Sequence, residues 1–63
     1  MDPDLLSKVS KLLKIATELL AEVHTTYTAG QYQQCSKAAL ELERTTFSLS
    51  ANTYLLKRQT QHG

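Results

Sequence analysis

The sequence predicts an all-α fold, an antiparallel hairpin of two helices. Apolar or small residues recur at alternating three- and four-residue steps in two long runs, and Gly30 separates the runs. Residues three and four apart share one face of a helix, so each run predicts a helix with an apolar seam. The first run comprises Leu5, Val9, Leu12, Ala16, Leu19 and Val23; the second comprises Tyr32, Cys35, Ala39, Leu42, Thr46, Leu49, Thr53 and Leu56.

The first helix is expected over about residues 3–28. Asp2 is a typical N-cap, and Pro3 suits the first helical position because its missing N–H is not needed there. Asp4 places negative charge beside the positive end of the helix dipole. A second row widens the apolar face into the kind of surface that packs in a multi-helix core: Leu6, Leu13, Leu20 and Tyr27.

The turn is expected at about residues 29–31 and the second helix at about 31–58. Gly30 is the residue best able to adopt the left-handed conformation that ends a helix. Lys57 and Arg58 suit the last turn of the second helix, where cations meet the negative end of the dipole. Residues 59–63 are expected to form a frayed tail.

The second helix carries a further apolar stripe, in addition to its seam. Leu40, Phe47 and Tyr54 recur every seven residues, with Ala51 between the last two. Either a twisted hairpin covers part of both stripes, or the stripe packs against another chain. The second interpretation predicts six partner-binding residues, since aromatic side chains dominate interface energetics: Leu40, Phe47, Ala51, Tyr54, Tyr27 and Tyr32.

The chain of 63 residues is expected to form a single domain with a modest core. Domains of this size usually need disulfides, a metal or a partner chain for stability. A single cysteine excludes an internal disulfide, and Cys35, His24 and His62 lack the close paired spacing of a metal site. The sequence therefore favours completion of the hairpin to a four-helix bundle, by dimerisation or by a helical partner.

Composition argues against nucleic acid and membranes as partners. The net charge is +1, from seven basic and six acidic residues, and the one basic cluster is Lys8, Lys11 and Lys14. The alternative interpretation is a dimeric helical-bundle regulator that binds nucleic acid. No apolar run approaches ~20 residues and the N-terminus lacks the apolar stretch of a signal peptide, so a soluble, cytoplasmic or otherwise intracellular protein is expected.

The residue pattern does not predict an enzyme, a cofactor or a small-molecule substrate. Cys35 falls on the seam, where a small buried hydrophobe is the ordinary role of cysteine. His24 lies near the end of the first helix, where its interaction with the dipole explains it. Glu41 and Glu43 face different directions on a helix, so they do not form a paired carboxylate site.

The stretch from Tyr27 to Leu42 resembles the turn of a tetratricopeptide-type hairpin, in which a glycine, an aromatic and a small residue follow in the spacing of Gly30, Tyr32 and Cys35. Val23, Ala39 and Phe47 depart from that family's pattern. In architecture alone, the chain is similar to the dimeric hairpin of the repressor-of-primer family. These resemblances imply a non-enzymatic protein–protein interaction module, or a small subunit or adaptor of a larger complex.

Overall fold

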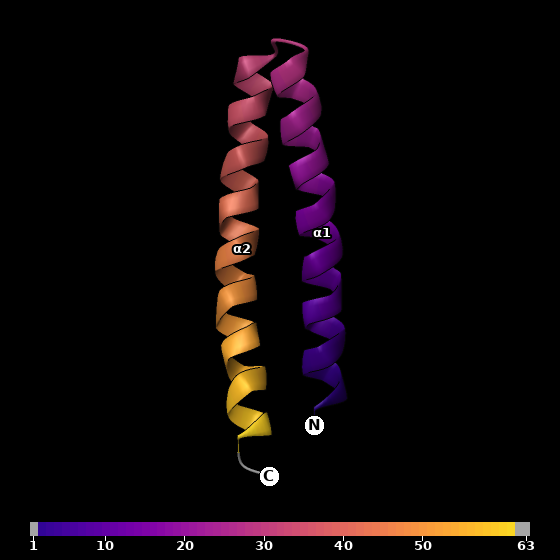
Figure 1. The fold of residues 1–63 in the computed structure, drawn as a ribbon, viewed down its shortest axis with the longest axis vertical. Coiled ribbons are helices and arrows are strands. Elements are labelled where there is room, and N and C mark those ends of the chain that lie inside the picture. The colour runs from indigo at the N-terminus through magenta and orange to yellow at the C-terminus, as the bar shows by residue number, and fades with distance from the viewer. Residues whose placement is uncertain (1, 62–63) are drawn as a thin grey trace.

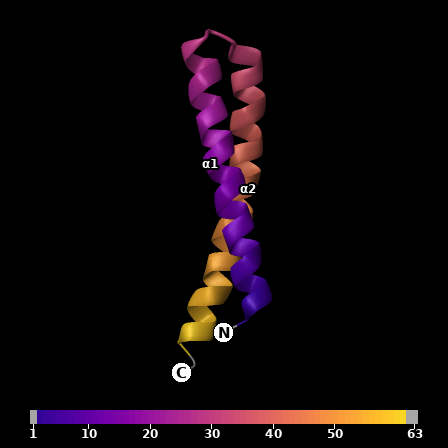
Figure 2. The same cartoon turned by 90° about the vertical axis from the view of Figure 1, so that its right-hand side faces the viewer.

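The chain forms two long antiparallel helices in the computed structural model, which describes residues 2–61 (Figure 1). Helix α1 spans Pro3–Thr28 and helix α2 spans Tyr32–Thr60. The Cα extents are 49 × 14 × 13 Å, and a second view shows the helices crossing at a shallow angle along their length (Figure 2). The predicted all-α, two-helix hairpin is confirmed.

The C-terminal end of α2 differs from the expectation. Gln59 and Thr60 are helical, although residues 59–63 were expected to be frayed. The side chain of Gln59 accepts a hydrogen bond at 3.3 Å from the backbone N–H of Asp2, which links the last turn of α2 to the start of α1. Residues 62 and 63, also part of the expected tail, lie outside the described residues.

The start of α1 agrees with the predicted capping. The Asp2 carboxylate accepts a hydrogen bond from the backbone N–H of Asp4 at 2.9 Å, and Pro3 occupies the first turn. The cap satisfies one of the N–H groups that lack a partner within the helix.

The turn is a Schellman motif centred on Gly30. Gly30 has φ +73°, and its N–H donates to the Tyr27 carbonyl at 3.1 Å. The N–H of Gln31 donates to the Thr26 carbonyl at 2.9 Å. These two bonds satisfy two of the last carbonyls of α1, and the chain reverses within three residues, as the position of Gly30 predicts.

The seam of α1 follows the predicted residues along its whole length. Leu5 and Val9 are buried and the later members, from Leu12 to Val23, are half-buried. Thr26 extends the seam by one further step and is buried. Its hydroxyl donates to the Glu22 carbonyl at 2.7 Å, so its burial leaves no polar atom without a partner.

The predicted seam of α2 is wrong in one of its two rows. Four of its members are half-buried: Cys35, Leu42, Leu49 and Leu56. The second row of the observed seam, which alternates with these four residues along α2, is Ala38, Thr45 and Asn52, all buried or half-buried. The residues predicted for that row, Ala39, Thr46 and Thr53, are exposed. Tyr32 is also exposed, by 66%.

The difference arises because the Cys35–Leu56 row has a similar set of small or weakly polar side chains on each side. One flank is Ala38, Thr45 and Asn52, and the other is Ala39, Thr46 and Thr53, so either could face α1. Ala38 is only 4% exposed and lets the two helices approach closely. Asn52 is buried at little cost, because its amide donates to the Ser48 carbonyl of its own helix at 2.7 Å. The α2 helix therefore turns this flank toward α1.

The core of the hairpin is thin. Its buried hydrophobic residues are Leu5, Val9 and Ala38, and no side chain among residues 2–61 is completely buried. A seam of this kind supplies little of the apolar burial that stabilises a fold.

Gly30→Ala is expected to lower the free energy of unfolding by about 1 kcal/mol, because a Cβ is strained at positive φ. Space is not the reason, since a Cβ at this position meets nothing within 4 Å. Gly30→Asn is the matched control and should lose less, because asparagine tolerates this conformation better. Urea denaturation at one fixed protein concentration measures both. Equal losses for the two variants would contradict the backbone explanation.

Ala38→Leu is expected to destabilise the hairpin by about 1–3 kcal/mol, because the larger side chain must separate the helices at their contact. Ala21→Leu adds the same atoms at an exposed position of α1 and should change the stability by less than about 0.5 kcal/mol. Thermal unfolding followed by circular dichroism compares them. A tolerated Ala38→Leu would show that the contact lies along another row of α2.

Candidate functional site

The most prominent surface feature is the number of large apolar side chains left in contact with solvent. Phe47 is 77% exposed, and nine others are exposed by between 44% and 66%. The other nine are Leu6, Leu13, Ile15, Leu20, Tyr27, Tyr32, Leu40, Tyr54 and Leu55. Isolated apolar residues are ordinary on protein surfaces, but rows of them mark sites of association.

The first row lies on α1 beside the seam, and we call it the leucine row: Leu6, Leu13, Leu20 and Tyr27. Its members are exposed by 45%, 53%, 59% and 64% respectively. Each member follows a seam residue by one position, which rotates it by roughly 100° about the helix axis. The leucine row therefore lines one side of the hairpin.

The second row lies on α2 and borders the same side; we call it the threonine row: Ala39, Thr46 and Thr53. Tyr32 precedes Ala39 by seven residues and continues this row toward the turn. The rings of Tyr27 and Tyr32 meet edge to face, with centroids 6.3 Å apart and planes at 60°. This contact places the two rows on one side of the hairpin, and together they form the leucine–threonine face.

The threonine row is less polar than its composition suggests. The Thr46 hydroxyl donates to the Glu43 carbonyl at 2.9 Å. The Thr53 hydroxyl donates to the Leu49 carbonyl at 2.7 Å and to the Ser50 carbonyl at 3.1 Å. Both donors are used within α2, so the remaining methyl groups can be covered without leaving a donor unpaired.

The third row lies on the outer side of α2, and we call it the aromatic row: Leu40, Phe47 and Tyr54. Each member follows a seam residue of α2 by five positions, a rotation of roughly 140°. Leu40 is 48% and Tyr54 57% exposed, and Ala51 beside them is exposed as well. A shallow hollow lies between this row and the threonine row, lined by Glu43, Arg44, Thr46 and Phe47.

The six predicted partner-binding residues are all exposed but do not form a single cluster. Tyr27 and Tyr32 lie together at the turn and belong to the leucine–threonine face. The others, Leu40, Phe47, Ala51 and Tyr54, follow the outer side of α2. The sequence interpretation missed the leucine–threonine face because it assigned Ala39, Thr46 and Thr53 to the seam. The sequence identified the leucine row by its seven-residue spacing, but it did not identify the row of α2 that lies beside it.

Charged side chains lie mainly away from the leucine–threonine face. By the helical step of roughly 100° per residue, Lys8, Glu22 and Glu41 lie on the other side of the seam from this face. Lys8, Lys11 and Lys14 spread over roughly 120° of α1, so they do not form one basic face. Lysines spaced in this way do not line up as a row of phosphate contacts, so they do not favour the nucleic-acid alternative.

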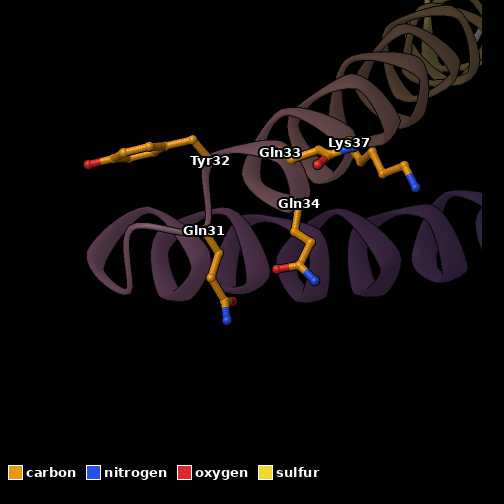
Figure 3. Close-up of a pocket in the computed structure, with 5 residues that line it drawn as sticks. All are labelled: Gln31, Tyr32, Gln33, Gln34 and Lys37. Carbon is orange, nitrogen blue, oxygen red and sulfur yellow. The ribbon is translucent and has the colours of Figure 1, made fainter.

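A second hollow, at the turn, does not form a binding site. It is lined by Gln31, Tyr32, Gln33, Gln34 and Lys37. Gln31 and Gln34 extend in one direction, Tyr32 extends in a second direction, and Lys37 extends in a third (Figure 3). Catalytic and ligand sites need convergent polar groups, and these side chains diverge.

Cys35 and His24 have ordinary surroundings. The Cys35 thiol is half-buried and donates to the Val23 carbonyl at 3.5 Å across the seam, while His24 is exposed. Within residues 2–61, no group of three or more His, Cys, Asp or Glu side chains is placed to hold a metal ion. Over the same residues, neither helix combines the length and apolar character needed to span a bilayer. His62 lies outside the described residues.

Comparison with protein-family models, curated proteins and solved structures finds no match to this chain.

Proposed function

We propose that the protein is a non-enzymatic protein–protein interaction module or small subunit, which binds other helices through its exposed apolar rows. One observation carries this proposal. Three hydrophobic residues are buried in the described structure, whereas ten large apolar side chains are exposed by 44% or more.

The arrangement of the exposed residues supports association in preference to a loosely packed monomer. Seven of the ten recur every seven residues, in the leucine row of α1 and the aromatic row of α2, which is the spacing by which a further helix packs against a helix. Covering them contributes about 25 cal/mol for each square ångström removed from water. The hairpin is thus completed by further helices, from a second copy or from a larger partner.

The aromatic row supplies the strongest candidate anchors within these surfaces. Phe47 is the most exposed large apolar residue of those described, and buried aromatic side chains carry much of the binding energy in protein interfaces. Leu40, Ala51 and Tyr54 extend the contact along α2. Recognition through such a row depends on shape and apolar area, and it requires no reacting group.

Phe47→Asp is expected to weaken association through the aromatic row at least tenfold in Kd, about 1.4 kcal/mol, because a carboxylate would be buried where this row meets a further helix. The helical signal of the hairpin should persist at high concentration, since Phe47 is hardly used within the monomer. Gln34→Asp adds the same charge at an exposed polar position of α2 and should leave association unchanged. Sedimentation equilibrium over a dilution series measures the solution mass.

A wild-type hairpin that stays folded and monomeric from micromolar to millimolar concentration would contradict the proposal. Equal weakening by Phe47→Asp and Gln34→Asp would contradict the assignment of the aromatic row, because charge alone would then explain the effect.

A further inference from the structure

Three contacts fix which residues lie at the same height on the two helices. They join Asp2 to Gln59, Val23 to Cys35, and Tyr27 to Tyr32. For two residues at the same height, one on α1 and one on α2, the residue numbers therefore add up to about 60. By this relation the members of the leucine row and the threonine row lie at matching heights: Leu6 with Thr53, Leu13 with Thr46, and Leu20 with Ala39.

The leucine–threonine face thus presents a bulky side chain beside a small one at three successive levels. A second copy related by a two-fold axis along the hairpin places its α2 over the first copy's α1, with all heights unchanged. Each leucine then meets alanine or threonine of the other copy. A two-fold axis across the hairpin would instead place leucine over leucine and threonine over threonine. Large residues facing small ones interdigitate better, so the lengthwise axis is favoured.

The polar cost of covering this face is low. The Thr46 and Thr53 hydroxyls already donate within α2. The nearest charged residues on α2 lie at the outer border of the leucine–threonine face. They are Glu43, four positions after Ala39, and Lys57, four positions after Thr53. The corresponding border of α1 carries no lysine, arginine or carboxylate side chain, since its residues are Ser10, Thr17 and His24. A second copy would therefore bring no pair of like charges together, and a net charge of +1 adds little repulsion between copies.

The dimensions of the hairpin are of the order that a stable dimer needs. A lengthwise face of 49 by 14 Å between Cα extremes covers roughly 690 Å² in projection, before side chains are counted. Stable interfaces bury about 800 Å² on each partner. The whole length of the hairpin is needed to reach this area, and the leucine row extends along nearly all of α1.

We propose that the leucine–threonine face binds a second copy of this chain, and that the two hairpins form a four-helix bundle with both turns at one end. This inference rests on the proposed function and names the partner for one of its surfaces. The aromatic row lies at the outer edge of such a bundle, rotated by roughly 100° from the threonine row. It remains available to the helices of a further copy or another partner, and this second association is the one that Phe47→Asp weakens.

Directed disulfide formation tests the arrangement. Two variants are made in a Cys35→Ala background, one with Leu13→Cys and the other with Thr46→Cys. They are mixed in urea, refolded together and exposed to a mild oxidant. The mixed sample should cross-link at least tenfold faster than either variant alone, because residue 13 of one copy faces residue 46 of the other. A matched pair at equal height, Glu18→Cys with Glu41→Cys, lies away from the face and should not cross-link.

The possible failures are distinguishable. This dimer would be overturned if either variant cross-linked rapidly with itself, or if Glu18→Cys cross-linked rapidly with Glu41→Cys. If the solution mass were still that of a dimer, the proposed function would stand. A monomeric mass at every concentration, with a retained helical signal, would overturn both. A dimer that cross-links only between positions 13 and 46 is the expected result.

Discussion

The packing of α1 against α2 depends on a seam in which α1 contributes mainly leucine and valine, whereas α2 contributes one row with three leucines and a second row of small or weakly polar side chains. Ala38 brings the helices together, yet it offers little apolar area, and Thr45 and Asn52 at the next levels add less. A fully buried leucine contributes about 1.5–3 kcal/mol, and no described side chain of this hairpin is completely buried. The seam therefore aligns the helices without supplying much stability.

The same constraint explains the exposed rows. Two helices meet along a narrow line, so an apolar face as wide as that of α1 extends beyond the contact. The leucine row is the part that α2 does not cover. Because Leu40, Phe47 and Tyr54 lie on the outer side of α2, the hairpin has nothing with which to cover them, and α2 does not reach the leucine row. Folding and association are therefore coupled in this account.

Local features were predictable from the sequence, and the rotation of α2 was not. The Asp2 cap, the turn at Gly30 and the seam of α1 each depend on residues close together in the chain. The α2 seam depends on a choice between two flanks that both begin with alanine and continue with threonine. Periodicity does not separate Ala38 from Ala39 or Thr45 from Thr46, so the choice is made by packing against α1. The exposure of the aromatic row was predictable from its spacing, whereas the leucine–threonine face followed only from the observed rotation.

The central claim is that burial of the exposed rows by another chain supplies stability that the seam lacks. Thermal unfolding of the wild-type chain over a hundredfold range of protein concentration tests this claim most directly. Mass action then requires the midpoint temperature to rise with concentration, because association stabilises only the folded state. A midpoint temperature that stays the same throughout the range would show that the isolated hairpin is stable by itself, and would contradict the account.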